Sequence, residues 1–97
     1  MMEEESDFSG DNIRVDPNGR FVVIRINPRL YKTHVIMRAA DDLIHAEKDK
    51  YDVILDGDPE KEIIAKFIPR EGKVEKEELM RIAYRFNTLL VKCSGKG

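Results

Sequence analysis

The chain has 97 residues, of which 41% are hydrophobic and 37% charged, and its formal net charge is −2 at pH 7. A chain of this length forms one domain and cannot build two domains or a deep cleft closed by a lid. The near balance of charge argues against a dedicated nucleic-acid-binding protein, because such proteins usually carry an excess of basic residues.

The apolar runs and the cysteine count set the expected compartment. The longest uninterrupted apolar runs, residues 21–24 and 89–91, are far shorter than the roughly 20 residues of a membrane-spanning helix. No basic region followed by an apolar stretch opens the chain, so we expect no signal peptide. The single cysteine, Cys93, cannot form an internal disulfide. We therefore expect a cytoplasmic protein with no membrane partner.

Residues 1–12 are polar and acidic and show no hydrophobic periodicity. We interpret them as a disordered, solvated tail in front of the domain. Five of the 19 acidic residues precede the first basic residue, Arg14, so residues 12–97 retain 14 acidic against 17 basic residues. The domain itself is therefore slightly basic.

Residues 16–19, Asp-Pro-Asn-Gly, are a strong turn signal. Proline presets φ at the second turn position, and Asn-Gly tolerates positive φ. Runs rich in β-formers flank the turn at 12–15 and 20–26. The pattern predicts a hairpin whose second strand is the more secure.

The first helix is predicted from about residue 28 to residue 48. Asn27 is a favourable N-cap, and proline is tolerated at the first helical position, occupied by Pro28. Apolar residues then recur at spacings of three and four, which predicts one buried stripe. The stripe consists of Leu30, Val35, Ile36, Met37, Ala39, Ala40, Leu43 and Ile44.

The second half of the chain repeats the order strand, strand, helix. A strand at 51–55, a turn at 56–59 and a strand at 62–68 ended by Pro69 predict a second hairpin. A last helix is expected at about 74–91, with the clearest helical stripe of the chain. That stripe consists of Leu79, Ile82, Ala83, Phe86, Leu89 and Leu90.

The predicted fold class is α+β, in the order (β)-β-α-β-β-α, with a three- or four-stranded sheet and two helices. The single domain is expected at 13–92, followed by a flexible tail at 93–97. The strands at 20–26 and 62–68 are apolar on both faces, because side chains alternate along a strand. Two helices cover both faces only from opposite sides; if they share one face, a second chain or partner must cover the other.

We find no catalytic, cofactor-binding or metal-binding constellation in the sequence. His34 and His45 are eleven residues apart, about 16 Å along a helix, which is too far for one metal ion. Cys93 lacks a partner histidine at a recognisable spacing. The glycines are scattered turn residues, and none forms a phosphate-binding loop. We therefore expect no enzyme activity and no cofactor.

The leading hypothesis is a non-enzymatic accessory or binding domain whose partner is a protein, a peptide or a second copy of itself. The alternative is an RNA-binding α+β module that uses Arg81, Arg85 and the basic residues of the first helix. A third reading is a small enzyme or metal-binding protein. The basic residues of the RNA alternative also have an ordinary structural explanation. Glu77 and Arg81 are four residues apart on the last helix, a spacing at which they can form an ion pair. The candidate interaction surface comprises Arg29, Arg38, His45, Arg81 and Arg85.

Three stretches carry a resemblance to a known family. They are Leu30-Tyr31 with Val35-Ile36-Met37-Arg38-Ala39-Ala40, then Phe67-Ile68-Pro69-Arg70, and finally Phe86-Asn87-Thr88-Leu89-Leu90. Over about residues 20–91 the chain resembles the small His-Xaa-Ser system protein family (HxsD-like). The resemblance implies a small accessory protein of a peptide-modification system that works beside radical enzymes, with no catalytic residues of its own.

Overall fold

The structure, a computed structural model, describes residues 12–58 and 60–95. Within these residues the expected α+β class and element order are confirmed. The elements are β1 (Ile13–Val15), β2 (Val22–Ile26), α2 (Thr33–Ala46), β3 (Tyr51–Asp58), β4 (Glu62–Pro69) and α3 (Lys76–Gly95).

The sheet has four strands in the spatial order β1-β2-β4-β3, and every neighbouring pair is antiparallel. β4 therefore lies between β2 and β3, which run parallel to each other without touching. In the register, Val23 of β2 stands opposite Arg14 of β1 on one side and Lys66 of β4 on the other. The optional first strand of the predicted order is thus part of the sheet.

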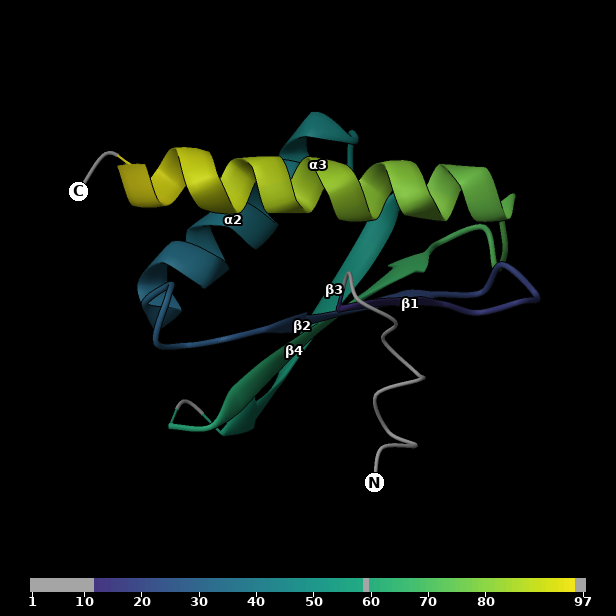
Figure 1. Cartoon of the computed structure of the whole chain (residues 1–97). Helices are drawn as coiled ribbons and strands as arrows, with labels where there is room; N and C mark the ends of the chain where they lie inside the picture. The colour runs from purple at the N-terminus through teal and green to yellow at the C-terminus, as the bar shows by residue number, and fades with distance from the viewer. Residues whose placement is uncertain (1–11, 59, 96–97) are drawn as a thin grey trace, which may run out of the picture.

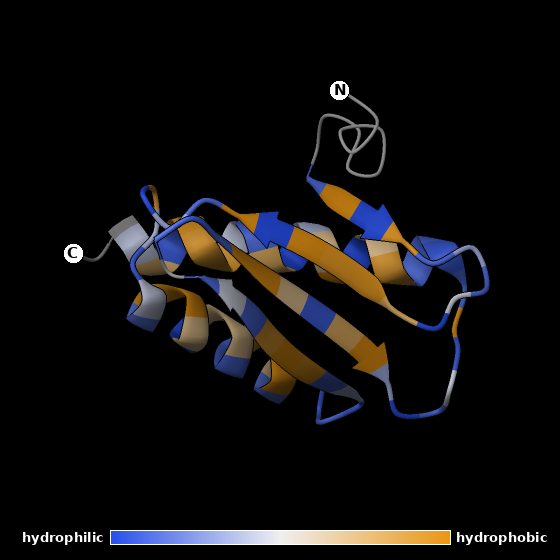
Figure 2. Cartoon of the chain, turned by 90° about the horizontal axis from the view of Figure 1, so that it is seen from below, coloured by the Kyte–Doolittle hydropathy of each residue, from blue (hydrophilic) through white to orange (hydrophobic). Residues whose placement is uncertain are grey.

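Both helices cover the same face of the sheet, as Figure 1 shows for α2 and α3 above the strands. Figure 2 looks onto the other face, where the strands lie in front and the helices behind. Of the two arrangements considered from sequence, the one with both helices on one side is the one found. The core lies between helices and sheet. Its fully buried large side chains are Phe67, Phe86, Ile24, Ile36, Leu43, Leu79, Ile82 and Val22.

The predicted turn at 16–19 is confirmed, and it also packs against Val74 in the loop that precedes α3. The Gly19 N–H donates to the Asp16 carbonyl oxygen at 2.9 Å, and the Arg20 N–H donates to the Asp16 carboxylate at 3.0 Å. Gly19 has a φ of 75°, and a Cβ at this position would collide with the Val74 carbonyl oxygen. The Val74 N–H donates back to the Gly19 carbonyl oxygen at 2.9 Å. Only glycine fits this close approach.

The first helix starts later than the sequence predicts, at Thr33 instead of about residue 28. The Asn27 side chain accepts a hydrogen bond from the Arg29 N–H at 2.9 Å, and its carbonyl oxygen accepts from the Leu30 N–H at 3.0 Å. Asn27 therefore closes a short turn of its own instead of capping α2, and extended Lys32 occupies the N-cap. Leu30, expected in the buried stripe, is 70% exposed as a result.

α2 ends in a Schellman motif. The Asp49 N–H donates to the Ile44 carbonyl oxygen and the Lys48 N–H to the His45 carbonyl oxygen, both at 3.0 Å. Lys48 holds a φ of 58° at the position where glycine is usual. This sharp reversal turns the chain directly into β3.

The second hairpin turns two residues later than predicted. β3 continues through 56–58, and Gly57 pairs with Ile63 of β4. The turn forms instead on Asp58, whose carbonyl oxygen accepts the Lys61 N–H at 2.8 Å and whose carboxylate accepts the Glu60 N–H at 2.9 Å. Gly57 can extend the strand because it adopts a φ of 118°, which other residues rarely adopt.

The last helix is longer than the apolar stripe suggests. α3 runs from Lys76 to Gly95, so the first part of the expected tail at 93–97 is helical. The Ser94 hydroxyl donates to the Val91 carbonyl oxygen at 3.1 Å, which continues the helical hydrogen bonding past the stripe. The expected acidic tail lies outside the described residues, apart from Asn12.

Candidate functional site

The main candidate site is the face of the sheet that the helices leave uncovered, which we call the open face. Residues paired across antiparallel strands share a face, so the register defines its members. They are Arg14 of β1; Val23 and Arg25 of β2, with Phe21 just before it; Glu62, Ile64, Lys66 and Ile68 of β4; and Asp52, Ile54, Asp56 and Asp58 of β3.

Five side chains of the open face are large and apolar. Ile54 is 50% exposed and the other four are half-buried. None belongs to the hydrophobic cluster under the helices, and none packs against that cluster. The register spreads them around Lys66, which stands between Val23 and Ile54. Exposed apolar side chains gathered on one face typically mark an interaction site. The five are Phe21, Val23, Ile54, Ile64 and Ile68.

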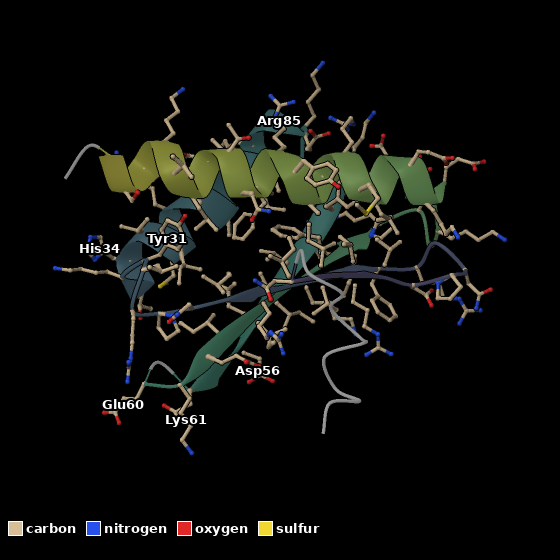
Figure 3. The ribbon with its side chains drawn as sticks, in the orientation of Figure 1. Tyr31, His34, Asp56, Glu60, Lys61 and Arg85 are labelled. Atoms are coloured by element: carbon tan, nitrogen blue, oxygen red, sulfur yellow. The ribbon has the colours of Figure 1, made fainter. Side chains whose placement is uncertain are left out.

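The charges of the open face change sign from one edge of the sheet to the other. Arg14 on β1 is basic, whereas Asp52 and Asp56 on the opposite edge strand, β3, are acidic. Figure 3 shows Asp56 on the side of the sheet that faces away from α3. On the middle strands, β2 and β4, apolar side chains alternate with Arg25, Glu62 and Lys66. Arg25 and Glu62 form an ion pair, with Nε and Oε1 3.8 Å apart. The face therefore combines a mixed middle with a basic edge and an acidic edge.

Local contacts hold several of these charged groups in place. Lys66 lies over the Phe21 ring, with its Nζ 4.5 Å from the ring centroid, a favourable cation–π distance. The Arg70 Nε donates to the Asp52 carboxylate at 3.0 Å. Arg14, in contrast, is exposed on the basic edge.

A shallow groove runs beside the acidic edge, between α2 and β3. It is lined on the helix side by Met37 and Ile44 and on the strand side by Val53 and Leu55. The sequence places Met37 in the buried stripe, but it is 56% exposed. α2 packs beside β3, which is an edge strand of the sheet. Met37 therefore lies beyond the edge of the sheet and stays exposed.

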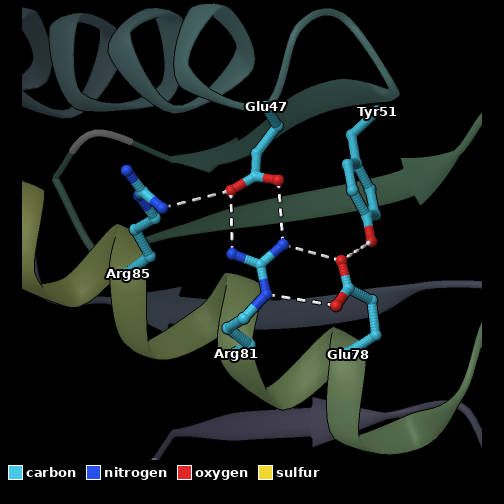
Figure 4. A network of polar contacts seen from close by, with 5 residues as sticks. All are labelled: Glu47, Tyr51, Glu78, Arg81 and Arg85. Carbon is cyan, nitrogen blue, oxygen red and sulfur yellow. Dashed lines mark hydrogen bonds and ion pairs between the residues drawn. The ribbon is translucent and has the colours of Figure 1, made fainter.

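On the helix side, a network of charged groups joins α2, β3 and α3 (Figure 4). Arg81 donates two hydrogen bonds to Glu47, at 2.9 and 3.1 Å, and two to Glu78, at 2.7 and 3.1 Å. Arg85 Nη1 lies 3.5 Å from Glu47 Oε2, and the Tyr51 hydroxyl donates to Glu78 at 3.1 Å. The Glu47 side chain is only 9% exposed. The network braces the end of α2 against α3.

The contacts of this network shift the pKa values of three of its members. The hydrogen bonds from Arg81 keep the pKa of Glu78 below its ordinary range. Burial, together with the hydrogen bond to Glu78, raises the pKa of Tyr51 well above its ordinary range. The bonds to Glu78 and Glu47 likewise raise the pKa of Arg81. All three shifts move the pKa away from neutral pH, so Tyr51, Glu78 and Arg81 keep their charge states there, as suits a structural brace.

The structure brings together only two of the five residues of the predicted interaction surface. Arg81 and Arg85 meet through Glu47, at the end of α2. Arg29 precedes the start of α2, about 20 Å of helix away. Arg38 is exposed on α2, and His45 is exposed with its Nδ1 3.3 Å from a backbone carbonyl oxygen on its own helix.

The partner of Arg81 also differs from the sequence prediction. Glu77 was expected to pair with it, but the carboxylates that bind it are Glu78, three residues away, and Glu47 on α2. A contact between residues 47 and 81 leaves no sequence signal, since it depends on how the two helices pack. With both carboxylates engaged, Arg81 has little capacity left for a phosphate.

No group of three or more potential metal ligands gathers within residues 12–58 and 60–95. The Cys93 Sγ lies 3.9 Å from an Asp42 carboxylate oxygen. Among the residues that the structure covers, no helix combines the length and apolar character that crossing a membrane requires.

Comparison with known proteins identifies no relative. No protein-family model matches the chain, and neither a curated protein nor a solved structure matches it. The open face was anticipated in outline by the two-sided strands, because alternation alone reveals them. Its charge gradient could not be anticipated, because it depends on the strand order.

Proposed function

We propose that this protein is a non-enzymatic binding domain that presents the open face to another polypeptide. The observation that carries the proposal is one-sided coverage of the sheet. Both helices pack on one face, as Figure 2 shows. Five large apolar side chains on the strands belong to the other face and lie outside the core cluster. Protein interfaces likewise combine apolar side chains with charged and polar ones.

The free energy for binding comes from completing the burial of these side chains. Fully burying an Ile or Val side chain contributes about 1.5–3 kcal/mol relative to full exposure. Ile54, at 50% exposure, has most left to gain, while Val23 and Ile64 are already half-buried. The charged edges add register and orientation more than affinity.

The same geometry favours a protein partner over RNA. The RNA reading uses Arg81, Arg85 and the basic residues of the first helix, and the two arginines of α3 both lie against the Glu47 carboxylate. An arginine already paired with a carboxylate must give up that pair to bind a phosphate. The acidic edge of the open face also repels a phosphate backbone.

The resemblance to the His-Xaa-Ser system proteins suggests the setting in which such binding would occur. We propose an accessory role in a peptide-modification system, in which the domain holds a protein or peptide and performs no chemistry itself. This role agrees with the polar network of Arg81, Glu47 and Glu78, whose hydrogen bonds join one part of the fold to another.

Site-specific photo-crosslinking tests the binding face. A photo-reactive residue at position 54 should form covalent adducts with another polypeptide when the full chain is expressed in cells. The matched control is position 84, because Tyr84 on α3 is 51% exposed, almost the same as Ile54. Adducts from position 84 alone, or none from position 54, would contradict the proposal. Mass spectrometry of the adducts identifies the second polypeptide.

A further inference from the structure

We infer that the polypeptide bound by the open face is a second copy of this chain, packed face to face about a two-fold axis parallel to the strands. The inference rests on the proposed function, since it names the partner for the same face. Its basis is that the charges of the face complement the face itself. The basic edge and the acidic edge lie at opposite ends of the strand order, with β1 and β3 outermost.

A two-fold axis parallel to the strands, passing between β2 and β4, exchanges the two edges. It lays β1 of one copy over β3 of the other, and β2 over β4. The register places Arg14 level with Val23, Lys66 and Ile54 across the sheet. Arg14 of one copy therefore lies over Ile54 of the second copy.

Asp52 and Asp56 flank Ile54 on the open face, because alternate residues of a strand share a face. In the dimer the Arg14 guanidinium thus lies between two carboxylates of the second copy. Asp56 is its main partner there, because Asp52 already accepts a hydrogen bond from Arg70 at 3.0 Å. A two-fold interface is isologous, so the contact forms twice. Arg14 is exposed in the single chain and therefore available for it.

The other face-to-face arrangement is electrostatically unfavourable. A two-fold axis perpendicular to the strands lays β1 over β1 and β3 over β3. Arg14 then approaches Arg14, and the aspartates of β3 approach each other. Like charges facing across an interface oppose association, so the charge gradient selects the parallel axis.

The middle of the face suits sheet-on-sheet packing. Val23 of β2 and Ile64 and Ile68 of β4 lie on the two strands nearest the axis, where two inner faces meet about 10 Å apart. Arg25 and Glu62 lie on the same strands toward one end of the face, where they pair with each other at 3.8 Å. Lys66 also lies there, but its amine rests over the Phe21 ring. The methylene stem of Lys66 can add apolar contact while the amine points toward the rim. The product is a β-sandwich with helices on both outer sides.

The test uses two charge-reversed full-length variants, Arg14→Glu and Asp56→Lys, and measures dimer dissociation by sedimentation equilibrium. Each variant repels itself at both symmetric contacts, so each should dissociate at least about tenfold more readily than the unaltered chain. An equimolar mixture of the two variants should dimerise about as tightly as the unaltered chain. In the heterodimer the introduced glutamate of one copy meets the introduced lysine of the other, while the original Arg14–Asp56 contact forms at the second site. Circular dichroism checks that both variants fold.

Arg38→Glu is the matched control, since Arg38 is exposed on α2, on the helix side, and its reversal should leave dimerisation unchanged. Recovery of the mixture supports the inference. The inference is overturned if the mixture dissociates as readily as the single variants. It is also overturned if Arg38→Glu weakens the dimer as much as the two open-face variants do. A full chain that stays monomeric while position 54 crosslinks to a different protein overturns the dimer and leaves the proposed function standing. A chain that dimerises only after deletion of residues 2–11 also overturns it, because its own acidic segment then occupies the face.

Discussion

The two faces of the sheet are built from the same strands, but one face packs into the core and the other stays partly exposed. Under the helices, Phe67 and Phe86 are fully buried, with ring centroids 5.1 Å apart in an edge-to-face contact. On the open face the apolar side chains stay partly exposed and alternate with charges. β4 shows both patterns in one strand, since its odd-numbered residues Ile63, Ala65 and Phe67 are buried and Ile64 and Ile68 are not. Successive residues of one strand thus belong in turn to the buried face, which stabilises the fold, and to the open face, which is free to make contacts.

The largest expected difference between the faces is in stability. Phe67→Ala should lower the free energy of unfolding by about 3–5 kcal/mol, because it removes a fully buried ring from the core. Ile54→Ser on the open face should change the stability of the single chain by less than about 0.5 kcal/mol. Urea denaturation at one fixed, low protein concentration measures both. Equal losses would show that the open face is part of the core.

The next largest effect tests whether the charged brace belongs to the stabilising face. Glu47→Gln should destabilise the protein by about 2 kcal/mol, because Arg81 and Arg85 lose the carboxylate between them. Asp41→Asn is the control, since Asp41 lies in the same helix with an exposed side chain. Thermal unfolding of the two variants gives the comparison. A Glu47 variant as stable as the control would mean that the brace contributes nothing.

A smaller effect should appear as a dependence on pH. The pKa of Glu78 is lowered in the folded protein, so its ionised form contributes stability above its unfolded pKa. That contribution is lost as pH falls through the folded pKa. Glu78→Gln should therefore be less stable than the unaltered chain at pH 7, and the gap should close in acid, below about pH 4. Chemical denaturation across this pH range checks it. A gap that stays constant with pH rules out ionisation of Glu78 as its cause.

The smallest expected effect is a gain in stability. Lys48→Gly should stabilise the protein by up to about 1 kcal/mol, because left-handed backbone favours glycine and Lys48 adopts that conformation. The site lies on neither face, so the open-face contacts should be unaffected. Thermal unfolding together with sedimentation separates the two readouts. A loss of stability would mean that the Lys48 side chain makes a stabilising contact of its own.

The sequence predicts most of the architecture because its signals are local. The stripe from Leu79 to Leu90 identifies α3, and the Asp-Pro-Asn-Gly turn identifies the first hairpin. Local signals fail where two good turn formers compete: Asn27 closes a turn instead of capping the helix, and Asp58 turns the chain in place of Asp56. They also cannot place the helices on one face, nor bring Glu47 to Arg81, because those outcomes depend on packing between distant segments.

The strand order has a consequence for how the chain reaches its fold. β4 is the last strand in the sequence, yet it lies inside the sheet, where Phe67 pairs with Val22 on one side and with Val53 on the other. During synthesis the β1–β2 hairpin can form early, but nothing joins it to β3 until β4 has left the ribosome. Assembly of the sheet is therefore delayed until a single late segment arrives, and long-range pairing of this kind slows folding. A nascent chain that stops before residue 62 carries a hairpin, a helix and a lone strand with no sheet to unite them.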